Sequence, residues 1–224
     1  MLKVKFRIFL FLISSGIFAI FTLFSYTVAK EMWQSVDFDT TVKLQDHISR
    51  RFDLEFSYFS LVGSAEVTFA IAGFISIFNL IRFKVWSSLG WLMVIPASAV
   101  EIFGKLVLFH PGPPVLFHRS ILETTLPSFY IHTNFSYPSG HMIRTTFLTT
   151  ALLIVGLSTT KNNFTKLIFL ILAIGFIFIM GLTRVYLGEH WLSDVVGGVM
   201  LGASCGILAS VFIIGKKAEK NLHF

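Results

Sequence analysis

Cysteine is almost absent from this chain, since Cys205 is the single one among 224 residues. One thiol can form neither an internal disulfide nor a metal cluster built on thiolates. Charge is scarce as well: 13% of the residues are Asp, Glu, Lys or Arg, whereas 54% are hydrophobic and 26 are Phe. That amount of apolar surface exceeds what one soluble core of this size can bury. The composition therefore predicts an integral membrane protein.

Six apolar runs are long enough, at about 20 residues, to cross a hydrocarbon core about 30 Å thick. They are Phe6–Ala29, Phe59–Ile81, Ser87–Phe109, His141–Ser158, Leu167–Arg184 and Asp194–Gly215. Because lipid offers no hydrogen-bond partners to the backbone, each run is expected to be a helix. The predicted fold class is all-α, a single membrane domain over residues 1–224 with six transmembrane helices.

The first run ends in Val28-Ala29-Lys30 and lacks a small-x-small cleavage site, so we interpret it as an uncleaved anchor. With a cytoplasmic N-terminus, the inner segments hold one acid, Glu219, and many basic residues. These are Lys3, Lys5, Arg7, Arg82, Lys84, Lys161, Lys166, Lys216, Lys217 and Lys220. The positive-inside rule then predicts cytoplasmic termini and outer loops at residues 30–58, 110–140 and 185–193. These lysines, in contact with anionic lipid headgroups, account for the net charge of +6 without nucleic acid.

The loop at residues 30–58 has Leu44, Ile48 and Phe52 at helical spacing. This spacing predicts a short amphipathic helix on the outer leaflet, with a structured connector as the alternative. No chemistry is assigned to this loop.

A His-Asp pair follows the fifth run. Arg184 closes that run, and His190 and Asp194 come next, four residues apart. On a helix this spacing lets a carboxylate fix the imidazole tautomer and leave the other ring nitrogen as a nucleophile or base. The planar fork of Arg184 suits phosphate oxygens. Taken alone, the pair also fits a hydrogen bond at a helix start or half of a metal site.

A second polar stretch, Tyr137-Pro138-Ser139-Gly140-His141, precedes the fourth run. Pro138 stops any preceding helix, Ser139 suits an N-cap, and the free N–H groups of Gly140 and His141 make an anion site. Arg144 lies one turn further into the helix, where its positive charge interacts unfavourably with the positive N-terminal end of the helix macrodipole. An anion bound between the helix end and Arg144 would remove this repulsion. Taken alone, Ser-Gly-His at a helix start is most often only a cap.

Two features inside the apolar runs complete the pattern. In the third run Glu101 and Lys105 have the spacing and order of an intrahelical ion pair. Ionisable residues at that depth are usually functional or paired. In the sixth run Gly198, Gly202 and Gly206 are spaced for close helix packing.

The Pro138-Ser139-Gly140-His141 stretch and the series Arg184, His190, Asp194 resemble two signatures of the type-2 phosphatidic-acid phosphatase superfamily. Thr183 stands where that family usually has Ser, and the resemblance covers about residues 58–215. It implies an outward-facing phosphatase site without a metal or other cofactor. His190 would attack phosphorus while Asp194 orients it, and His141 would protonate the leaving oxygen. The implied phosphate ligands are Lys105, Ser139, Gly140 and Arg184.

The chain departs from the family pattern in the first signature. The family pattern is a Lys, then six residues, then Arg-Pro. Lys105 and Pro113 match the Lys and the Pro, but Gly112 stands at the position of the Arg. We expect Arg119 to replace this phosphate ligand, with His110 as a weaker candidate. Arg144 is the other unassigned arginine near the site.

The expected function is hydrolysis of a lipid phosphate at the extracytoplasmic face through a phosphohistidine. An amphiphilic substrate fits a site ringed by Phe109, Leu116, Phe117, Leu126, Phe129, Tyr130 and Phe135. An ordinary interfacial aromatic belt is the alternative for that loop. Undecaprenyl diphosphate is the preferred substrate, with phosphatidylglycerophosphate and phosphatidate as alternatives. A lipid phosphotransferase and a non-catalytic lipid binder or transporter remain open. The expected partners are the lipid phosphate and the membrane lipids.

Overall fold

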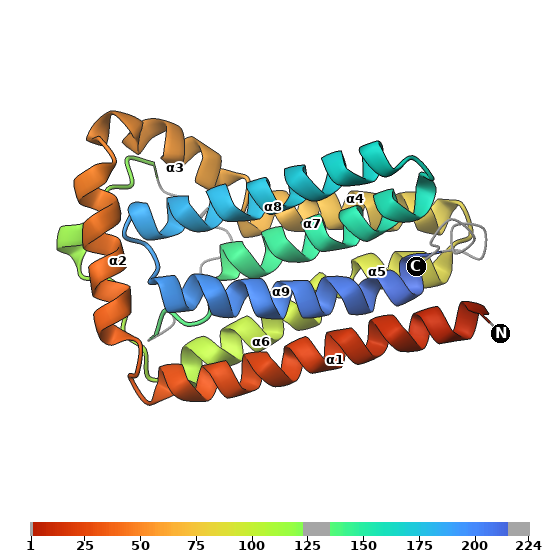
Figure 1. Ribbon diagram of the computed structural model, residues 1–224, viewed down its shortest axis with the longest axis horizontal. Coiled ribbons are helices and arrows are strands. Elements are labelled where there is room, and N and C mark those ends of the chain that lie inside the picture. The colour runs from red at the N-terminus through yellow and green to blue at the C-terminus, as the bar shows by residue number, and fades with distance from the viewer. Residues whose placement is uncertain (1, 123–134, 215–224) are drawn as a thin grey trace.

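The structure, a computed structural model, describes residues 2–122 and 135–214 and is helical throughout its ordered elements (Figure 1). The helices are α1 (Leu2–Ala29), α2 (Gln34–His47), α3 (Asp53–Leu61), α4 (Ala65–Ile81), α5 (Val85–Trp91), α6 (Val94–Val107), α7 (Gly140–Thr159), α8 (Asn163–Tyr186) and α9 (Leu192–Ile213). Two short 3-10 turns cover Arg50–Phe52 and Val115–Phe117. Among the described residues, six segments are long and apolar enough to cross a membrane. The predicted all-α bundle of six membrane-spanning helices is confirmed.

Two of the predicted spans are broken, which corrects the expectation of continuous helices. The second spanning segment begins at Arg50, earlier than predicted, and turns between α3 and α4. Ser64 restarts the helix there, because its hydroxyl accepts a hydrogen bond from the Val67 N–H at 3.3 Å. The third segment is interrupted between α5 and α6. Pro96 lies in the first turn of α6, where its missing N–H costs no helical hydrogen bond.

Helix α2 runs across one end of the bundle, whereas α1 begins and α9 ends at the opposite end (Figure 1). The short helix predicted within residues 30–58 is present as α2. It ends at His47, however, so the expected helical face through Ile48 and Phe52 is not continuous. Ile48 has extended backbone angles, and Phe52 belongs to the following 3-10 turn. The α2 residues Asp37 and Thr41 are buried against the bundle.

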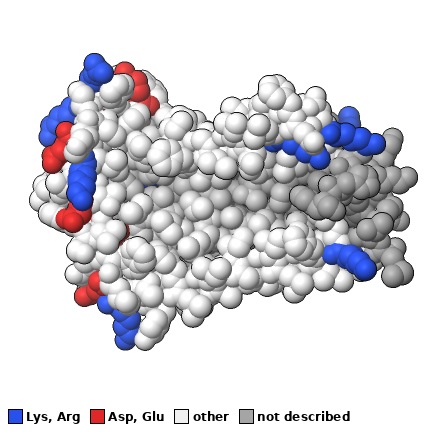
Figure 2. Space-filling view, in the orientation of Figure 1, with Lys and Arg blue, Asp and Glu red and all other residues white. Residues whose placement is uncertain are grey.

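Charged residues gather at the two ends of the molecule, and the surface between them is uncharged in the view of Figure 2. The α2 end carries both signs, and the opposite end shows Lys and Arg. Helix α8 has 24 residues, which corresponds to a length of about 36 Å at 1.5 Å per residue. This length matches an uncharged band that spans a bilayer.

Close packing of α7 against α9 positions the site. A Cβ atom at Gly198 would lie 2.7 Å from the Ser139 carbonyl oxygen, and one at Gly202 would lie 2.4 Å from that of Ile143. Only glycine allows so close an approach, as predicted for the glycine stripe. The approach brings the two N-terminal ends together, and the Ser139 N–H donates to the Asp194 carbonyl at 3.0 Å.

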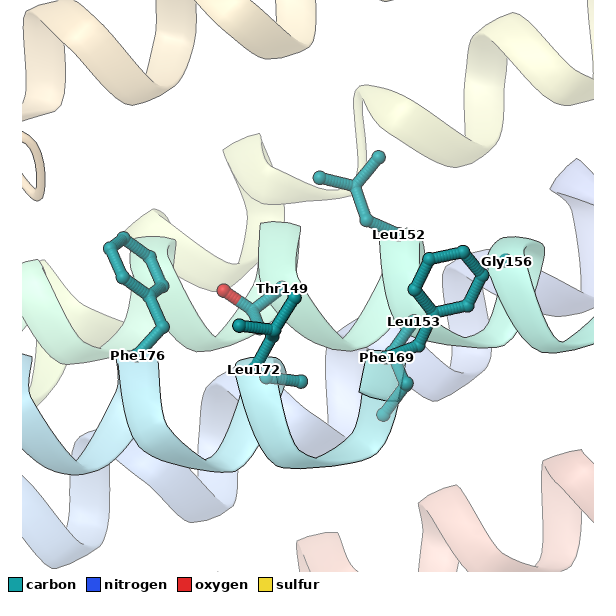
Figure 3. Close-up of a pocket in the computed structure, with 8 residues that line it drawn as sticks. Thr149, Leu152, Leu153, Gly156, Phe169, Leu172 and Phe176 are labelled. Carbon is teal, nitrogen blue, oxygen red and sulfur yellow. The ribbon is translucent and has the colours of Figure 1, made fainter. Parts of the chain in front are cut away.

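Further along, α7 and α8 leave between them an apolar groove of about 500 Å³ (Figure 3). Thr149 is the one polar side chain among its lining residues, which include Leu152, Leu172 and Phe176. The ionisable residues of both signatures lie nearer the α2 end, so this groove is separate from the candidate site.

Candidate active site

The His190–Asp194 pair forms at the N-terminus of α9. Nδ1 of His190 lies 3.1 Å from Oδ2 of Asp194, and the same oxygen accepts the Trp191 N–H at 3.1 Å. His190 precedes α9, so the pair is part of a helix cap. The prediction that both residues lie on one continuous helical face is therefore wrong. Because the carboxylate accepts the Nδ1 proton, the lone pair of Nε2 is left for attack on phosphorus.

The N-terminus of α7 begins at Gly140, with Ser139 in the cap position. The Ser139 side chain makes no capping hydrogen bond, which corrects the expected capping role. Its buried hydroxyl has no hydrogen-bond partner among the residues that the structure describes. A Cβ atom at Gly140 would lie 1.8 Å from a carboxylate oxygen of Glu101, so glycine is required there. The serine hydroxyl at the start of α7 is thus available to an anion.

Glu101 joins two cations from different helices. Its Oε1 lies 3.0 Å from Nζ of Lys105 on α6, and its Oε2 lies 2.7 Å from Nη1 of Arg144 on α7. The first contact confirms the predicted intrahelical pair, and the second was not predicted. The Nε atom of Arg144 is buried and has no hydrogen-bond partner in the described part of the chain. Arg144 therefore keeps a donor for a phosphoryl oxygen.

Arg184 lies in the last turn of α8 and is buried. Its guanidinium forms an ion pair with Glu189 and a hydrogen bond with the hydroxyl of Ser60 on α3. Neither partner was predicted from the sequence. Glu189 is close to Arg184 in the sequence, so this ion pair could have been suspected from the sequence. Ser60 is 124 positions from Arg184 along the chain, and no sequence pattern connects the two.

These groups lie close enough to influence one another electrostatically. The positive charges of Arg184, Arg144 and Lys105 act on His141, which is buried in the first turn of α7. Burial and the charges of Arg184 and Lys105 hold the pKa of His190 well below its usual value of 6.5. His190 is therefore neutral at pH 7, the state that a nucleophile needs. The structure thus brings together most of the predicted site residues, namely Lys105, Ser139, Gly140, His141, Arg144, Arg184, His190 and Asp194.

The structure places Arg119 away from this cluster, contrary to the expected phosphate contact. Its guanidinium donates to the carbonyl oxygen of Gln45 at 3.0 Å, to that of Ile48 at 3.4 Å and to the Tyr186 hydroxyl at 3.3 Å. Arg119 thus ties the 3-10 loop to the end of α2. Of the two arginines considered for the missing ligand, Arg144 is the one inside the cluster.

His110 is also directed elsewhere. Its Nε2 faces Ser193 and the carboxylates of Asp37 and Asp194. Of the expected apolar ring, Phe109 and Phe135 pack edge to face with a centroid separation of 5.4 Å. Leu126, Phe129 and Tyr130 lie outside the described residues.

Comparison with known proteins supports the fold. No curated protein matches the sequence. A phosphatidylglycerolphosphate phosphatase of the PAP2 type from Bacillus subtilis has a similar fold, with a TM-score of 0.62 and 17% identity. The match covers 88% of this chain and 93% of that one. LpxE from Aquifex aeolicus has a TM-score of 0.54 and 24% identity, over 78% of this chain and 94% of that one.

The family model of the PAP2 superfamily matches residues 85–217, which include the three signatures. This match covers more than half of the chain. The protein therefore belongs to the PAP2 superfamily.

Proposed function

We propose that the protein hydrolyses a lipid phosphate through a phosphohistidine on His190. The observation that carries the proposal is the neutral, buried imidazole held by Asp194 beside Arg184 and Lys105. A neutral ring can attack phosphorus, and fixed cations stabilise the charge that spreads over the phosphoryl oxygens.

In the first step Nε2 of His190 forms a bond to phosphorus while the bond from phosphorus to the leaving oxygen breaks. His141 donates a proton to that oxygen. In the second step His141 takes a proton from water, the water oxygen bonds to phosphorus, and the phosphorus–nitrogen bond breaks to release phosphate. The cations Lys105, Arg144 and Arg184 and the N–H groups of α7 hold the phosphoryl oxygens throughout.

An apolar groove supports a substrate with a hydrocarbon tail. It has a volume of about 540 Å³ and lies among α2, α8 and α9. Its walls include Val185 and Val195, the chain neighbours of Arg184 and Asp194. A tail in this groove would lie beside the cluster that binds the phosphate. A polyprenyl diphosphate such as undecaprenyl diphosphate is the first substrate to test, followed by phosphatidylglycerophosphate and phosphatidate.

The proposed face is extracytoplasmic. The start of α1, the α4–α5 turn and the α7–α8 turn lie at the end opposite α2 (Figure 1). Their described basic residues are Lys5, Arg7, Arg82, Lys84, Lys161 and Lys166, and no acid lies among residues 4–7, 82–84 or 160–166. The positive-inside rule assigns that end to the cytoplasm and the α2 end to the outside.

Phosphate release by the purified protein from these three lipids tests the function. We expect release that resists a metal chelator, is blocked by vanadate and is absent from His190→Ala. Radiolabelled phosphate should be trapped on wild-type protein but not on this variant. Strong inhibition by the chelator, reversed by a divalent metal, would instead support metal-assisted hydrolysis.

The alternatives are separated in the same assay. Added alcohols distinguish a phosphotransferase, because a transferase would yield the alkyl phosphate in place of free phosphate. A non-catalytic binder would retain the lipids and release nothing.

A further inference from the structure

The second oxygen of the Asp194 carboxylate faces another histidine. Oδ2 lies 3.1 Å from Nδ1 of His190, whereas Oδ1 lies 3.4 Å from Nε2 of His110. Both side chains are buried, Asp194 fully and His110 with 5% of its surface exposed. The Asp194 carboxylate therefore lies between two imidazoles, one from the α8–α9 connection and one from the loop after α6.

A hydrogen-bonded chain extends from His110 to α2. The Ser193 hydroxyl donates to Oδ2 of Asp37 at 2.7 Å, and the Ser193 N–H donates to Oδ1 of Asp37 at 2.8 Å. Nε2 of His110 lies 3.0 Å from the same hydroxyl oxygen. Because the one hydroxyl proton of Ser193 goes to Asp37, its oxygen accepts from His110. Nε2 of His110 therefore carries a proton, and the same nitrogen lies 3.4 Å from Oδ1 of Asp194, an oxygen with no hydrogen-bond partner among the described residues.

The backbone of His110 is held in place as well. The N–H and the hydroxyl of Ser136 both donate to the His110 carbonyl oxygen at 3.0 Å. The ring meets that of Tyr137 edge to face, with a centroid separation of 6.1 Å. The loop after α6 and the signature before α7 thus fix where the imidazole points.

We propose that His110 and Asp37 are positioning residues for Asp194, and that they keep its Oδ2 on the Nδ1–H of His190. The proposal rests on the proposed function, in which His190 is the nucleophile. Nε2 of His110 is 3.4 Å from Oδ1, close enough for electrostatic attraction, and Asp37 holds Ser193, the residue before Asp194, by two hydrogen bonds. Together these interactions favour one orientation of the Asp194 carboxylate. Partners of this kind, behind a residue that contacts the reacting group, set its orientation. Helix α2, to which the sequence assigned no chemistry, then supports the site through Asp37.

The surroundings of His110 argue against the earlier expectation that it binds phosphate. The charges that face it are those of Asp194 on α9, Asp37 on α2 and Glu31 in the α1–α2 turn. Three carboxylates repel an anion. Burial also lowers the pKa of His110, so the ring is a neutral donor at pH 7.

The test compares four variants in the purified full-length protein: His110→Ala, His110→Gln, Asp37→Asn and His118→Ala. His118 is an exposed residue of the same loop and serves as the control. For each, kcat, KM, the rate of phosphoenzyme formation and the thermal midpoint are measured with a lipid phosphate that the wild type hydrolyses. We expect His110→Ala and Asp37→Asn to lower kcat by about 10- to 100-fold, as is typical of such outer partners. KM and the thermal midpoint should change little. His110→Gln should recover part of the rate, because its amide can donate from a similar position.

A double-mutant cycle with Asp194→Ala decides whether His110 acts through Asp194. If it does, adding His110→Ala to Asp194→Ala causes no further loss. Additive losses, a wild-type kcat in His110→Ala, or losses of kcat and thermal midpoint that His110→Gln does not relieve would each overturn the proposal. A wild-type protein that releases no phosphate from any lipid would count against the proposed function instead.

Discussion

Arg144 and Glu101 form a buried ion pair between α7 and α6, with Nη1 of the arginine 2.7 Å from Oε2 of the glutamate. The same glutamate holds Lys105 through its other oxygen. Lys105 belongs to the first signature, in which Gly112 replaces the usual arginine. The pair thus places a guanidinium of α7 close to the lysine of the first signature, since both cations bind the same carboxylate.

The first prediction compares the two arginines. Arg144→Ala should lower kcat/KM by about 10²-fold or more, the loss expected for one preorganised charge contact. Arg144→Lys should recover only part of it, because an ammonium lacks the planar fork. Arg119→Ala should leave kcat near wild type, since its guanidinium binds the end of α2. The reverse ranking in a steady-state assay would show that Arg119 reaches the substrate.

The second prediction concerns Glu101. Glu101→Gln removes the counter-charge of half-buried Lys105 and leaves the buried Arg144 unpaired, a situation that costs about 3–5 kcal/mol in comparable buried pairs. The thermal midpoint in detergent should therefore fall. Vanadate should raise the midpoint of this variant more than that of the wild type, because the anion supplies the missing negative charge. Equal shifts in both proteins would mean that the two cations do not bind the anion.

The third prediction separates the two site histidines. His190→Ala should abolish turnover and trapped phosphoenzyme, because the nucleophile is lost. His141→Ala should retain more activity on a substrate with a good leaving group than on a simple alkyl phosphate, since a good leaving oxygen needs little protonation. Rate measurements on a matched pair of phosphate esters test this, and equal losses on both would contradict the acid role of His141.

The fourth prediction is a pH dependence. Because the pKa of His190 lies well below 6.5, kcat/KM should persist as the pH falls through 6.5 and decline only in more acidic buffer. Unfolded His190 binds a proton near pH 6.5 and the folded residue does not, so its contribution to stability is present above that pH. That contribution should diminish as the pH falls further. A pH series of kcat/KM and thermal midpoints measures both, and an acid limb above pH 6.5 would contradict the neutral nucleophile.

The fifth prediction fixes the orientation in the membrane. After Cys205→Ala, a cysteine at the exposed position Val115 should react with an impermeant maleimide in intact cells. A cysteine at Phe83, exposed at the opposite end, should react only after lysis. Labelling in the opposite order would place the site at the cytoplasmic face.

The sequence by itself determined the six spans and most of the groups that meet at the site. Apolar length requires a helix in lipid whatever the neighbours are, so composition sufficed for the fold class. The spacing of His190 and Asp194 and the pairing of Glu101 with Lys105 involve residues four apart. Local backbone brings such residues together without help from the rest of the fold, through a helix cap for His190 and Asp194 and through one turn of α6 for Glu101 and Lys105.

Only the tertiary structure decided the contacts between helices. Arg144 and Glu101 are 43 positions apart, and Ser193 is 156 from Asp37. Arg119 was expected to bind the phosphate, but its guanidinium contacts the end of α2. His110, the weaker candidate, faces the Asp194 carboxylate. Loop residues have no periodicity that tells which partner they reach. Their contacts depend on how closely α7 packs on α9 and on where α2 crosses the bundle, and both are properties of the assembled helices.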